Sequence, residues 1–193
     1  MARRNVSEER RRELIRAVAM TFADLGYRRT TTAALAERCG VQETILYRLW
    51  PDKRAMFLAA IDFVAEHSDA VWRRVRAAGS ASGSPTMRVL EHESEHLGEF
   101  GFYRILFAGL SETDDPEIAA AMRSAYQRFL TFIVDAVDEH RKRGKASGLP
   151  PADLTAWALL GLGTAANIGR ELRLLPAASR KRLLATIGRH LLG

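Results

Sequence analysis

The sequence predicts an all-α protein, and two observations lead to that prediction. Every segment with a regular hydrophobic repeat places its apolar residues three and four apart, the spacing of one face of an α-helix. No segment alternates apolar and polar residues as a half-buried strand does. The 193 residues, 47% of them hydrophobic, suffice for one ordinary domain or two small ones with a buried core.

The first quarter of the chain predicts three helices in close succession. The first begins after Ser7, a suitable N-cap, and ends at Gly26. The second follows the threonines at 30–32, where a hydroxyl can cap it, and ends at Gly40. The third is confined to the stretch before Pro51 and has only two to three turns. A helix this short is marginal in water when isolated, so the first two helices must support it.

The third helix has two different sides on a helical wheel. Leu46, Leu49 and Trp50 form the side that can pack on the preceding helices. Thr44, Tyr47 and Arg48 form the other side, which we expect to face outward, and Gln42 and Glu43 complete the polar start of the helix. A short helix that is braced from behind and offers polar side chains meets the physical requirement for reading a DNA major groove. The alternative is an ordinary solvated face of a small bundle.

Positive charge is concentrated at the same end of the chain. Residues 1–54 hold 12 basic and 7 acidic side chains, a net +5 out of +6 for the whole chain. This distribution favours a polyanionic partner, although a solubilising surface remains the alternative. The single Cys39 excludes a disulfide framework and is typical of a reducing cytosol. The chain shows no secretory signal pattern, and its longest apolar run, 156–169, is too short to span a membrane, so we expect a cytoplasmic protein.

The rest of the chain continues as helices. Asp52 is the expected cap of a fourth helix, and the later helices are predicted at 86–100, 102–112, 116–143, 152–173 and 178–192. Residues 152–173 are apolar on nearly every side, and such a helix must be covered on every side. A partner subunit could supply the missing cover.

The N-terminal run TFADLGYRRTTTAALAERCGVQETILYRLWPDKRAMF resembles the helix-turn-helix domain of the TetR family of bacterial transcriptional regulators. The matching features are Phe22, the GY pair that starts at Gly26, the threonines after it, Leu35-Ala36, Gly40-Val41, the LY pair at 46–47, Trp50 and Lys53. The resemblance implies a helix-turn-helix DNA-binding domain at 1–54 and a helical ligand-binding and dimerisation domain at 55–193. It implies a homodimeric repressor that binds a palindromic double-stranded DNA operator and is released by a small-molecule effector, without a cofactor.

The resemblance also implies DNA-binding roles for Thr31, Thr32, Gln42, Glu43, Thr44, Tyr47, Arg48 and Lys53. The threonine hydroxyls, the Tyr47 phenol and the Lys53 ammonium would contact phosphates, and the remaining side chains would contact base edges. The family often has Gly at the position of Thr44 and a small residue or Thr at Ile45, so its base preference does not transfer. Ile45 either contacts a thymine methyl group or packs, and Arg3 and Arg4 are either a minor-groove arm or an unstructured end.

Glu93 falls in the middle of the apolar arc predicted for 86–100, where a carboxylate is costly unless it is paired or used. It either reaches a nearby Arg or water, or anchors a ligand in an apolar cavity. The candidate lining of that cavity is Glu93, His96, Phe100, Tyr103, Phe107, Tyr126, Phe129, Trp157 and Asn167. Each aromatic residue in this set has core packing as its alternative.

Two other functional classes were weighed against the regulator. His92 and His96 in HESEH fit the H-x-x-E-H pattern of inverted zinc proteases, but no downstream ligand is evident, so we predict no metal, no catalytic residues and no enzyme. An architectural DNA-binding protein would bind through phosphates alone, with a flat preference among sequences. Whether the regulator represses or activates is not specified by these residues.

Overall fold

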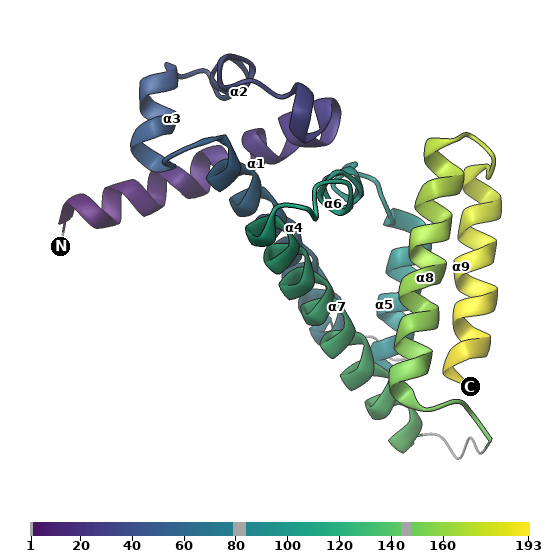
Figure 1. Cartoon of the computed structure of the whole chain (residues 1–193). Coiled ribbons are helices and arrows are strands. Elements are labelled where there is room, and N and C mark those ends of the chain that lie inside the picture. The colour runs from purple at the N-terminus through teal and green to yellow at the C-terminus, as the bar shows by residue number, and fades with distance from the viewer. Residues whose placement is uncertain (1, 79–83, 144–147) are drawn as a thin grey trace. The chain divides into compact units, whose positions relative to one another are not determined.

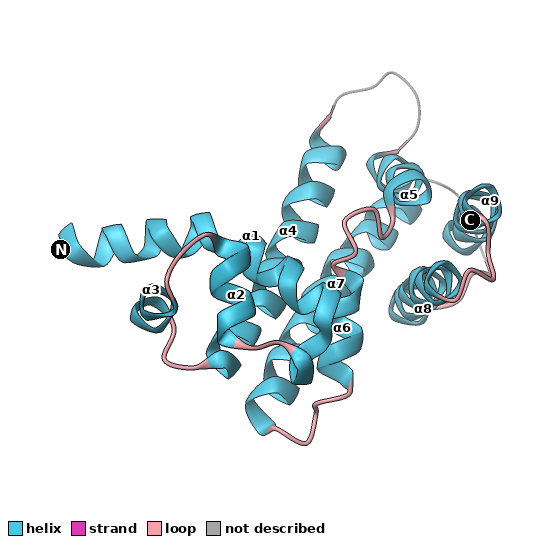
Figure 2. Ribbon diagram, turned by 90° about the horizontal axis from the view of Figure 1, so that it is seen from above, coloured by secondary structure: helices cyan, strands magenta, loops and turns pink. Residues whose placement is uncertain are grey.

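The computed structural model describes residues 2–78, 84–143 and 148–193, with side chains described from residue 7 onward, so the side chains of Arg3 and Arg4 lie outside the described part (Figures 1 and 2). The elements are α1 (Ala2–Arg29), α2 (Thr32–Cys39), α3 (Glu43–Leu49), α4 (Lys53–Ala77), α5 (Pro85–His96), α6 (Tyr103–Leu110), α7 (Pro116–Arg143), α8 (Ala152–Glu171) and α9 (Ala177–Leu192). All elements of the described residues are helices, which confirms the predicted all-α class. Within these residues, every helix falls short of the length and apolar character that crossing a bilayer requires.

The helices form two compact units. The first contains the chain up to His67 together with Phe100–Ala125, and the second contains Ser68–Glu99 together with Tyr126–Gly193. α4 and α7 therefore contribute residues to both units, and α6 belongs to the same unit as α1, α2 and α3. This division differs from the sequence-based boundary after residue 54, because long helices do not end where a motif ends.

The first unit has its core on the predicted apolar face of α1. Val18 and Phe22 are fully buried there. The Phe22 ring lies 4.9 Å from that of Phe57 on α4, and Tyr27 lies 4.8 Å from the same Phe57 ring. Tyr27 reaches this position because Gly26 has φ 73°, which interrupts the α1 helix one residue earlier. The aromatic contacts tie α1 to α4.

The N-terminal bound of α1 differs from the prediction. α1 begins at Ala2, so Ser7 lies inside the helix and the predicted N-cap there is wrong. The residues around it are good helix formers, and two ion pairs at i,i+3 spacing, Arg11–Glu8 and Arg10–Glu13, stabilise these turns. Charged surface residues thus extend the helix beyond its apolar stripe.

The second unit packs α5, α8 and α9 side by side (Figure 2). Ala156 and Ala166 of α8 and Leu184 and Leu192 of α9 are among its buried residues. The predicted helix 86–100 ends earlier, at His96. Its next residue has φ −52° and ψ 124°, and the glycine that follows has φ 73°, a conformation that terminates helices.

Candidate functional site

α2 and the turn after it set the position of α3. The Thr31 hydroxyl accepts a hydrogen bond from the Ala34 N–H at 3.2 Å, which confirms the predicted threonine cap of α2. Gly40 ends α2 with φ 63°, and its N–H donates to the Ala36 carbonyl. A left-handed residue followed by a short connection is how a chain leaves one helix and starts another within three residues.

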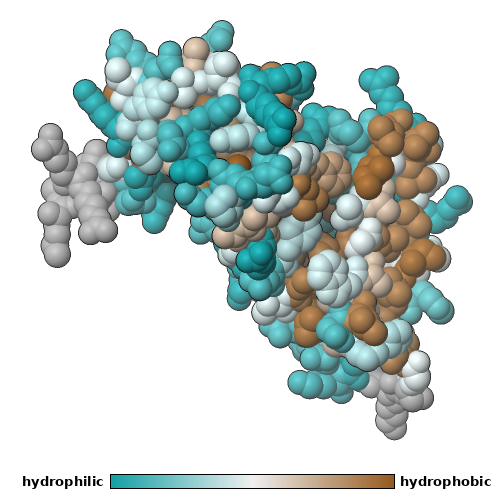
Figure 3. Space-filling view, viewed as in Figure 1, coloured by the Kyte–Doolittle hydropathy of each residue, from teal (hydrophilic) through white to brown (hydrophobic). Residues whose placement is uncertain are grey.

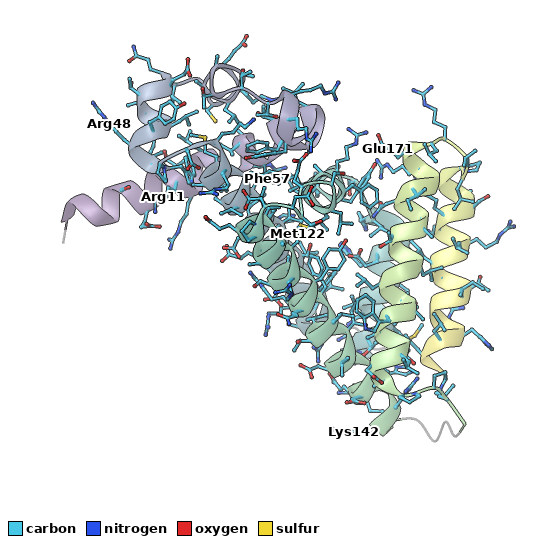
Figure 4. All side chains as sticks on the ribbon, viewed as in Figure 1. Arg11, Arg48, Phe57, Met122, Lys142 and Glu171 are labelled. Atoms are coloured by element: carbon cyan, nitrogen blue, oxygen red, sulfur yellow. The ribbon has the colours of Figure 1, made fainter. Side chains whose placement is uncertain are left out.

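The two sides of α3 are divided as predicted. Leu46, Leu49 and Trp50 are 0%, 6% and 5% exposed, so the apolar side is buried against the rest of the first unit. The exposed residues at and after its start are Gln42, Glu43, Thr44, Tyr47 and Arg48. Ile45, whose role was left open, is half-buried. The Arg48 side chain extends away from the ribbon (Figure 4).

Arg11 braces α3 in a way that the sequence analysis missed. Its guanidinium, on α1, donates to the Leu49 carbonyl at the C-terminus of α3, with a distance of 2.8 Å from Nε. The contact satisfies a carbonyl that has no partner within the helix and places a cation at the negative end of the helix dipole. The sequence did indicate that Arg11 faces inward, because it lies three, four and seven residues before apolar residues of α1 and therefore shares their face of the helix.

The threonines before α2 and the tyrosine of α3 meet at one surface. The Tyr47 hydroxyl lies 3.3 Å from the Thr32 hydroxyl, across the turn between the two helices. Tyr47 is exposed and Thr32 is half-buried. The oxygen of Thr31 accepts a backbone hydrogen bond, so its own O–H remains able to donate. Tyr47 donates its O–H to Thr32 Oγ1, so the hydroxyls of Thr31 and Thr32 are the ones that remain able to donate to an acceptor such as a phosphate.

Lys53 adds a positive charge next to a helix N-terminus. Its Nζ donates to the Tyr27 carbonyl at 3.1 Å and lies 4.6 Å from the centre of the Tyr27 ring. It is the first residue of α4, which Asp52 caps through a 2.7 Å bond from the Ala55 N–H to Oδ1, as predicted. A cation at the positive end of a helix dipole is unfavourable unless an anion is nearby. The ammonium holds further donors for such an anion.

The predicted ligand-binding residues of the first unit fall into two groups. Tyr103 is buried and its ring lies 5.6 Å from that of Phe107, so these two residues pack on each other, and their place in a ligand cavity stays a prediction. Phe100 is 52% exposed and lies against the His67 and Phe102 rings and under Arg16. α5 ends before Phe100 and the turn places it at the surface, so its ligand-binding role stays a prediction.

In the second unit, Glu93 belongs to a cluster with aromatic side chains. The Trp72 indole N–H donates to Glu93 Oε1 at 2.8 Å, so an indole takes the place of the arginine partner considered above. The Trp72 ring lies 5.6 Å from Phe129, which in turn lies 5.9 Å from Tyr126. Burial raises the pKa of Glu93, and it also raises that of Tyr126.

Trp72 was missed by the sequence analysis. A buried indole N–H needs a partner, and a carboxyl group in an apolar arc needs one too. Two such requirements in one helical domain form the signal that could have paired Trp72 with Glu93.

The other three predictions for the second unit have different outcomes. His96 is exposed and stacks on His92 with ring centres 4.4 Å apart, and Trp157 is 57% exposed, so the structure places both at the surface of this chain and their ligand-binding role stays a prediction. Asn167 is 7% exposed and lines a cavity between α5, α8 and α9 that does not include Glu93. The helical wheel gave the right face for Glu93 but could not tell which neighbouring helix each face meets.

Comparison with known proteins assigns the helix-turn-helix region, α1 to α3, to a family, and this region is called the head below. Residues 14–60 match the family model described as bacterial regulatory proteins, tetR family. The nucleoid occlusion factor SlmA of Marinomonas sp. is 40% identical over 62 residues, which cover 32% of this chain and 32% of that protein. The HTH-type transcriptional activator FasR of Mycolicibacterium smegmatis is 27% identical over 158 residues, covering 74% of this chain and 68% of that protein. The chain spans less than half of the length of the nucleoid occlusion factors it matches.

The fold extends the likeness to nearly the whole chain. The crystal structure of a TetR-family transcriptional regulator from Cytophaga hutchinsonii superposes with a TM-score of 0.77, over 96% of this chain and 94% of that chain, at 17% identity. At this identity the likeness shows a shared fold. The match over residues 14–60, which contains all of α2 and α3, carries the assignment. Residues 14–60 of this chain thus match the model of the tetR family of bacterial regulatory proteins, and the chain has the fold of the TetR-family regulator from Cytophaga hutchinsonii.

Proposed function

We propose that the protein is a ligand-responsive transcriptional regulator of the cytoplasm that binds a palindromic DNA operator as a homodimer and is released by a small molecule. One observation carries the proposal: α3 buries its whole apolar side and exposes five polar or aromatic side chains at and after its start. This is the arrangement of a recognition helix whose first turns enter a major groove. The family assignment of the head supports the same function.

The surroundings of α3 support a division of roles between phosphate and base contacts. Thr31 and Thr32 present hydroxyl donors, the Tyr47 phenol contacts Thr32, and Lys53 presents a cation at the start of α4. We assign these four residues to phosphates, which fix the position of the head without reading sequence. The Gln42 side chain makes no capping bond with α3, so its amide remains available for a base edge, as do Glu43, Thr44 and Arg48.

The exposed apolar side of α8 supports the homodimer. Leu154, Trp157 and Ile168 are 56%, 57% and 45% exposed, and Ile187 of α9 is 42% exposed. Figure 3 shows the hydrophobic residues of α8 and α9 gathered on one face of the second unit. A contiguous apolar patch of this kind marks an interface, and the isologous contact of a twofold dimer covers two such patches at once.

A homodimer would determine the symmetry of the operator and the spacing of its half-sites. Two heads related by a twofold axis would read half-sites about one helical turn, ~34–36 Å, apart. An effector that favours a dimer with a different head spacing would release the operator, and coupling of about 1–3 kcal/mol is typical of such control. α4 contributes residues to both units, from Lys53 onward, and is our candidate for the element that carries the change.

Selection of binding sites from a random oligonucleotide pool tests the proposal. We expect a single enriched palindrome with two half-sites about 10 base pairs apart. A flat distribution of selected sequences would contradict sequence-specific regulation and favour an architectural protein that binds phosphates alone.

Variants of the head then separate the two kinds of contact. Lys53→Ala should weaken binding to all DNA alike and reduce the slope of log K against log salt by about 1. Gln42→Ala should instead cost about 1–3 kcal/mol at one base position and leave the others unchanged. Lys142→Ala, an exposed lysine near the end of α7 in the second unit (Figure 4), is the matched control and should change neither quantity. Unchanged salt dependence for Lys53→Ala in fluorescence-anisotropy titrations would contradict the assignment of Lys53 to a phosphate.

Activation is a second candidate function, and it is favoured by the relative from Mycolicibacterium smegmatis, which is an activator. A reporter gene placed behind the selected palindrome distinguishes the two functions. Repression predicts that deletion of the regulator raises expression, and activation predicts that it lowers expression.

A further inference from the structure

Glu43 is the acidic residue of α3, and it lies in the first turn of the helix proposed above to enter the major groove. Its side chain is exposed and forms no ion pair or hydrogen bond with any residue that the structure describes. Three acidic residues of α1 differ from it, because Glu8, Glu13 and Asp24 are each paired with an arginine. An unpaired carboxylate therefore lies on the surface that is proposed to contact a polyanion.

The spacing of residues in α3 explains why this carboxylate has no partner on its own helix. Arg48 is the basic residue of α3, and it lies five residues after Glu43, about 140° around the helix. The residues three and four positions after Glu43, whose side chains could reach it, are the buried Leu46 and the exposed Tyr47. Neither of them is basic. The carboxylate thus shares a face of α3 with Tyr47, whose phenol contacts the Thr32 hydroxyl at 3.3 Å.

This position is unfavourable beside DNA unless the carboxylate accepts a hydrogen bond from a base. The phosphates repel a carboxylate, and the groove removes part of its water, so its charge is costly without a donor. The major groove offers two exocyclic donors, the N4 amino group of cytosine and the N6 amino group of adenine. Adenine places the N7 acceptor beside its donor, which repels the second carboxylate oxygen, whereas cytosine has no acceptor of its own there. Cytosine is therefore the base that a glutamate at this position fits.

We propose that Glu43 determines one base pair of each operator half-site by accepting a hydrogen bond from the N4 amino group of a cytosine. The same carboxylate excludes thymine and guanine at this position, since both bases present acceptors, O4 in thymine and N7 and O6 in guanine. The inference rests on the proposed function and adds to it a base that the operator must contain. The alternative role of Glu43 is stabilisation of α3 through the helix dipole, which favours an acidic residue in the first turn but gives no preference among bases.

Selection of binding sites from the random oligonucleotide pool, repeated with Glu43→Gln in the full chain, tests the proposal. A glutamine amide donates to N7 and accepts from the N6 amino group of adenine, so this variant should replace cytosine by adenine at one position of each half-site. Wild type should bind its own operator about tenfold more tightly than the operator with adenine at that position, and Glu43→Gln should reverse the order. The proposal is overturned if wild type selects half-sites without a G·C pair, or if both proteins select the same palindrome.

Glu43→Ala separates the recognition of a base from the effect of charge. This variant should lose the preference at that position and bind DNA of unrelated sequence about threefold more tightly at low salt, because one repulsion with the phosphates is removed. Fluorescence anisotropy with labelled duplexes measures both quantities. Glu37→Ala, at an exposed position of α2 without an ion-pair partner among the described residues, is the matched control and should keep every base preference of the wild type. A loss of affinity for all sequences alike in Glu43→Ala, with the cytosine preference retained, would show that Glu43 acts on helix stability alone and would overturn the proposal.

These outcomes distinguish the inference from the proposed function. A chain that selects a palindrome which Glu43→Gln also selects keeps its proposed function and loses this inference. A chain that selects no palindrome loses both.

Discussion

The helices α3 and α8 differ in how far their apolar side chains are buried within the chain. α3 has seven residues, and all of its large aliphatic side chains except the half-buried Ile45 are buried within the unit. α8 has 20 residues, and Leu154, Trp157 and Ile168 are each about half exposed. The short helix is complete within one chain, whereas the long helix leaves an apolar side without cover.

The difference shows that length does not decide how much support a helix receives. α3 is too short to form alone, and it is held by packing on one side and by Arg11 at its C-terminus. α8 has enough residues to form a regular helix and can therefore use one side for packing in the chain and the other for a partner. We propose that the polar side of α3 binds DNA and that the apolar side of α8 binds a second subunit.

The largest effect is expected where the support of α3 is removed. Leu46→Ala deletes a fully buried side chain and should lower the free energy of unfolding of the head by about 2–5 kcal/mol. Hydrogen exchange measured by mass spectrometry should show faster exchange across α2 and α3, with α8 and α9 unchanged. Glu43→Ala, at an exposed position of the same helix, is the control for stability. Equal protection of α3 in wild type and Leu46→Ala would show that packing does not hold this helix.

The second prediction tests the uncovered side of α8. Leu154→Lys and Trp157→Lys place a charge in the proposed dimer interface and should weaken dimerisation by about 2 kcal/mol or more, roughly thirtyfold in dissociation constant. Analytical ultracentrifugation measures the change. Leu110→Lys, which changes an equally exposed leucine at the end of α6, should leave the dimer intact. Dimers that persist in both α8 variants would contradict the assignment of this side to a partner subunit.

The third prediction concerns the brace at the C-terminus of α3. Arg11→Met keeps most of the side-chain length but removes the donors to the Leu49 carbonyl, and it should destabilise the head by about 1–2 kcal/mol. The readout is the rate of hydrogen exchange in α3 together with operator affinity. Arg12→Met, at the next and fully solvated position, should have no effect on either. If both variants behave alike, the brace contributes nothing to α3.

These cases also show which parts of the structure could be predicted from the sequence. The two sides of α3 followed from the spacing of Leu46, Leu49 and Trp50, because a side-chain period reports which residues share a face. The end of α5 at His96 did not follow, because a helical period gives no sign of where a backbone will take the left-handed conformation seen at Gly98. Hydrophobic periodicity shows which residues of a helix share a face, but it does not show at which residue the helix ends.

The candidate ligand site was predicted less well for the same reason. Glu93 was found because a carboxyl group in an apolar arc violates the pattern, but its partner Trp72 lies on another helix. Trp157 was placed in a cavity because it is aromatic, and the structure leaves it at the surface. A helical wheel shows which residues share a face. Which other helix packs against that face depends on the tertiary packing of all the helices.

The smallest expected effect comes from the paired carboxyl of the second unit. Because burial raises the pKa of Glu93, the stabilisation that the protonated group provides is complete below the pKa of the unfolded chain, about 4.3, and is lost as pH rises through the folded-state pKa. Glu93→Gln keeps an oxygen for the Trp72 N–H and cannot ionise. It should change the melting temperature little at pH 4 and raise it at pH 8, by about 2–4 °C for each kcal/mol of relieved penalty.

Scanning calorimetry at the two pH values measures this difference, and Glu91→Gln, at an exposed position of the same helix, should shift the melting temperature equally at both. The hydrogen bond from Trp72 and, to a smaller extent, the charge of His96 lower the pKa of Glu93 and therefore reduce the effect without reversing its sign, since burial is the larger influence. A larger gain at pH 4 than at pH 8 would mean that the ionised carboxylate is the favoured form in the folded protein. The pair of Trp72 and Glu93 would then hold a carboxylate anion at neutral pH.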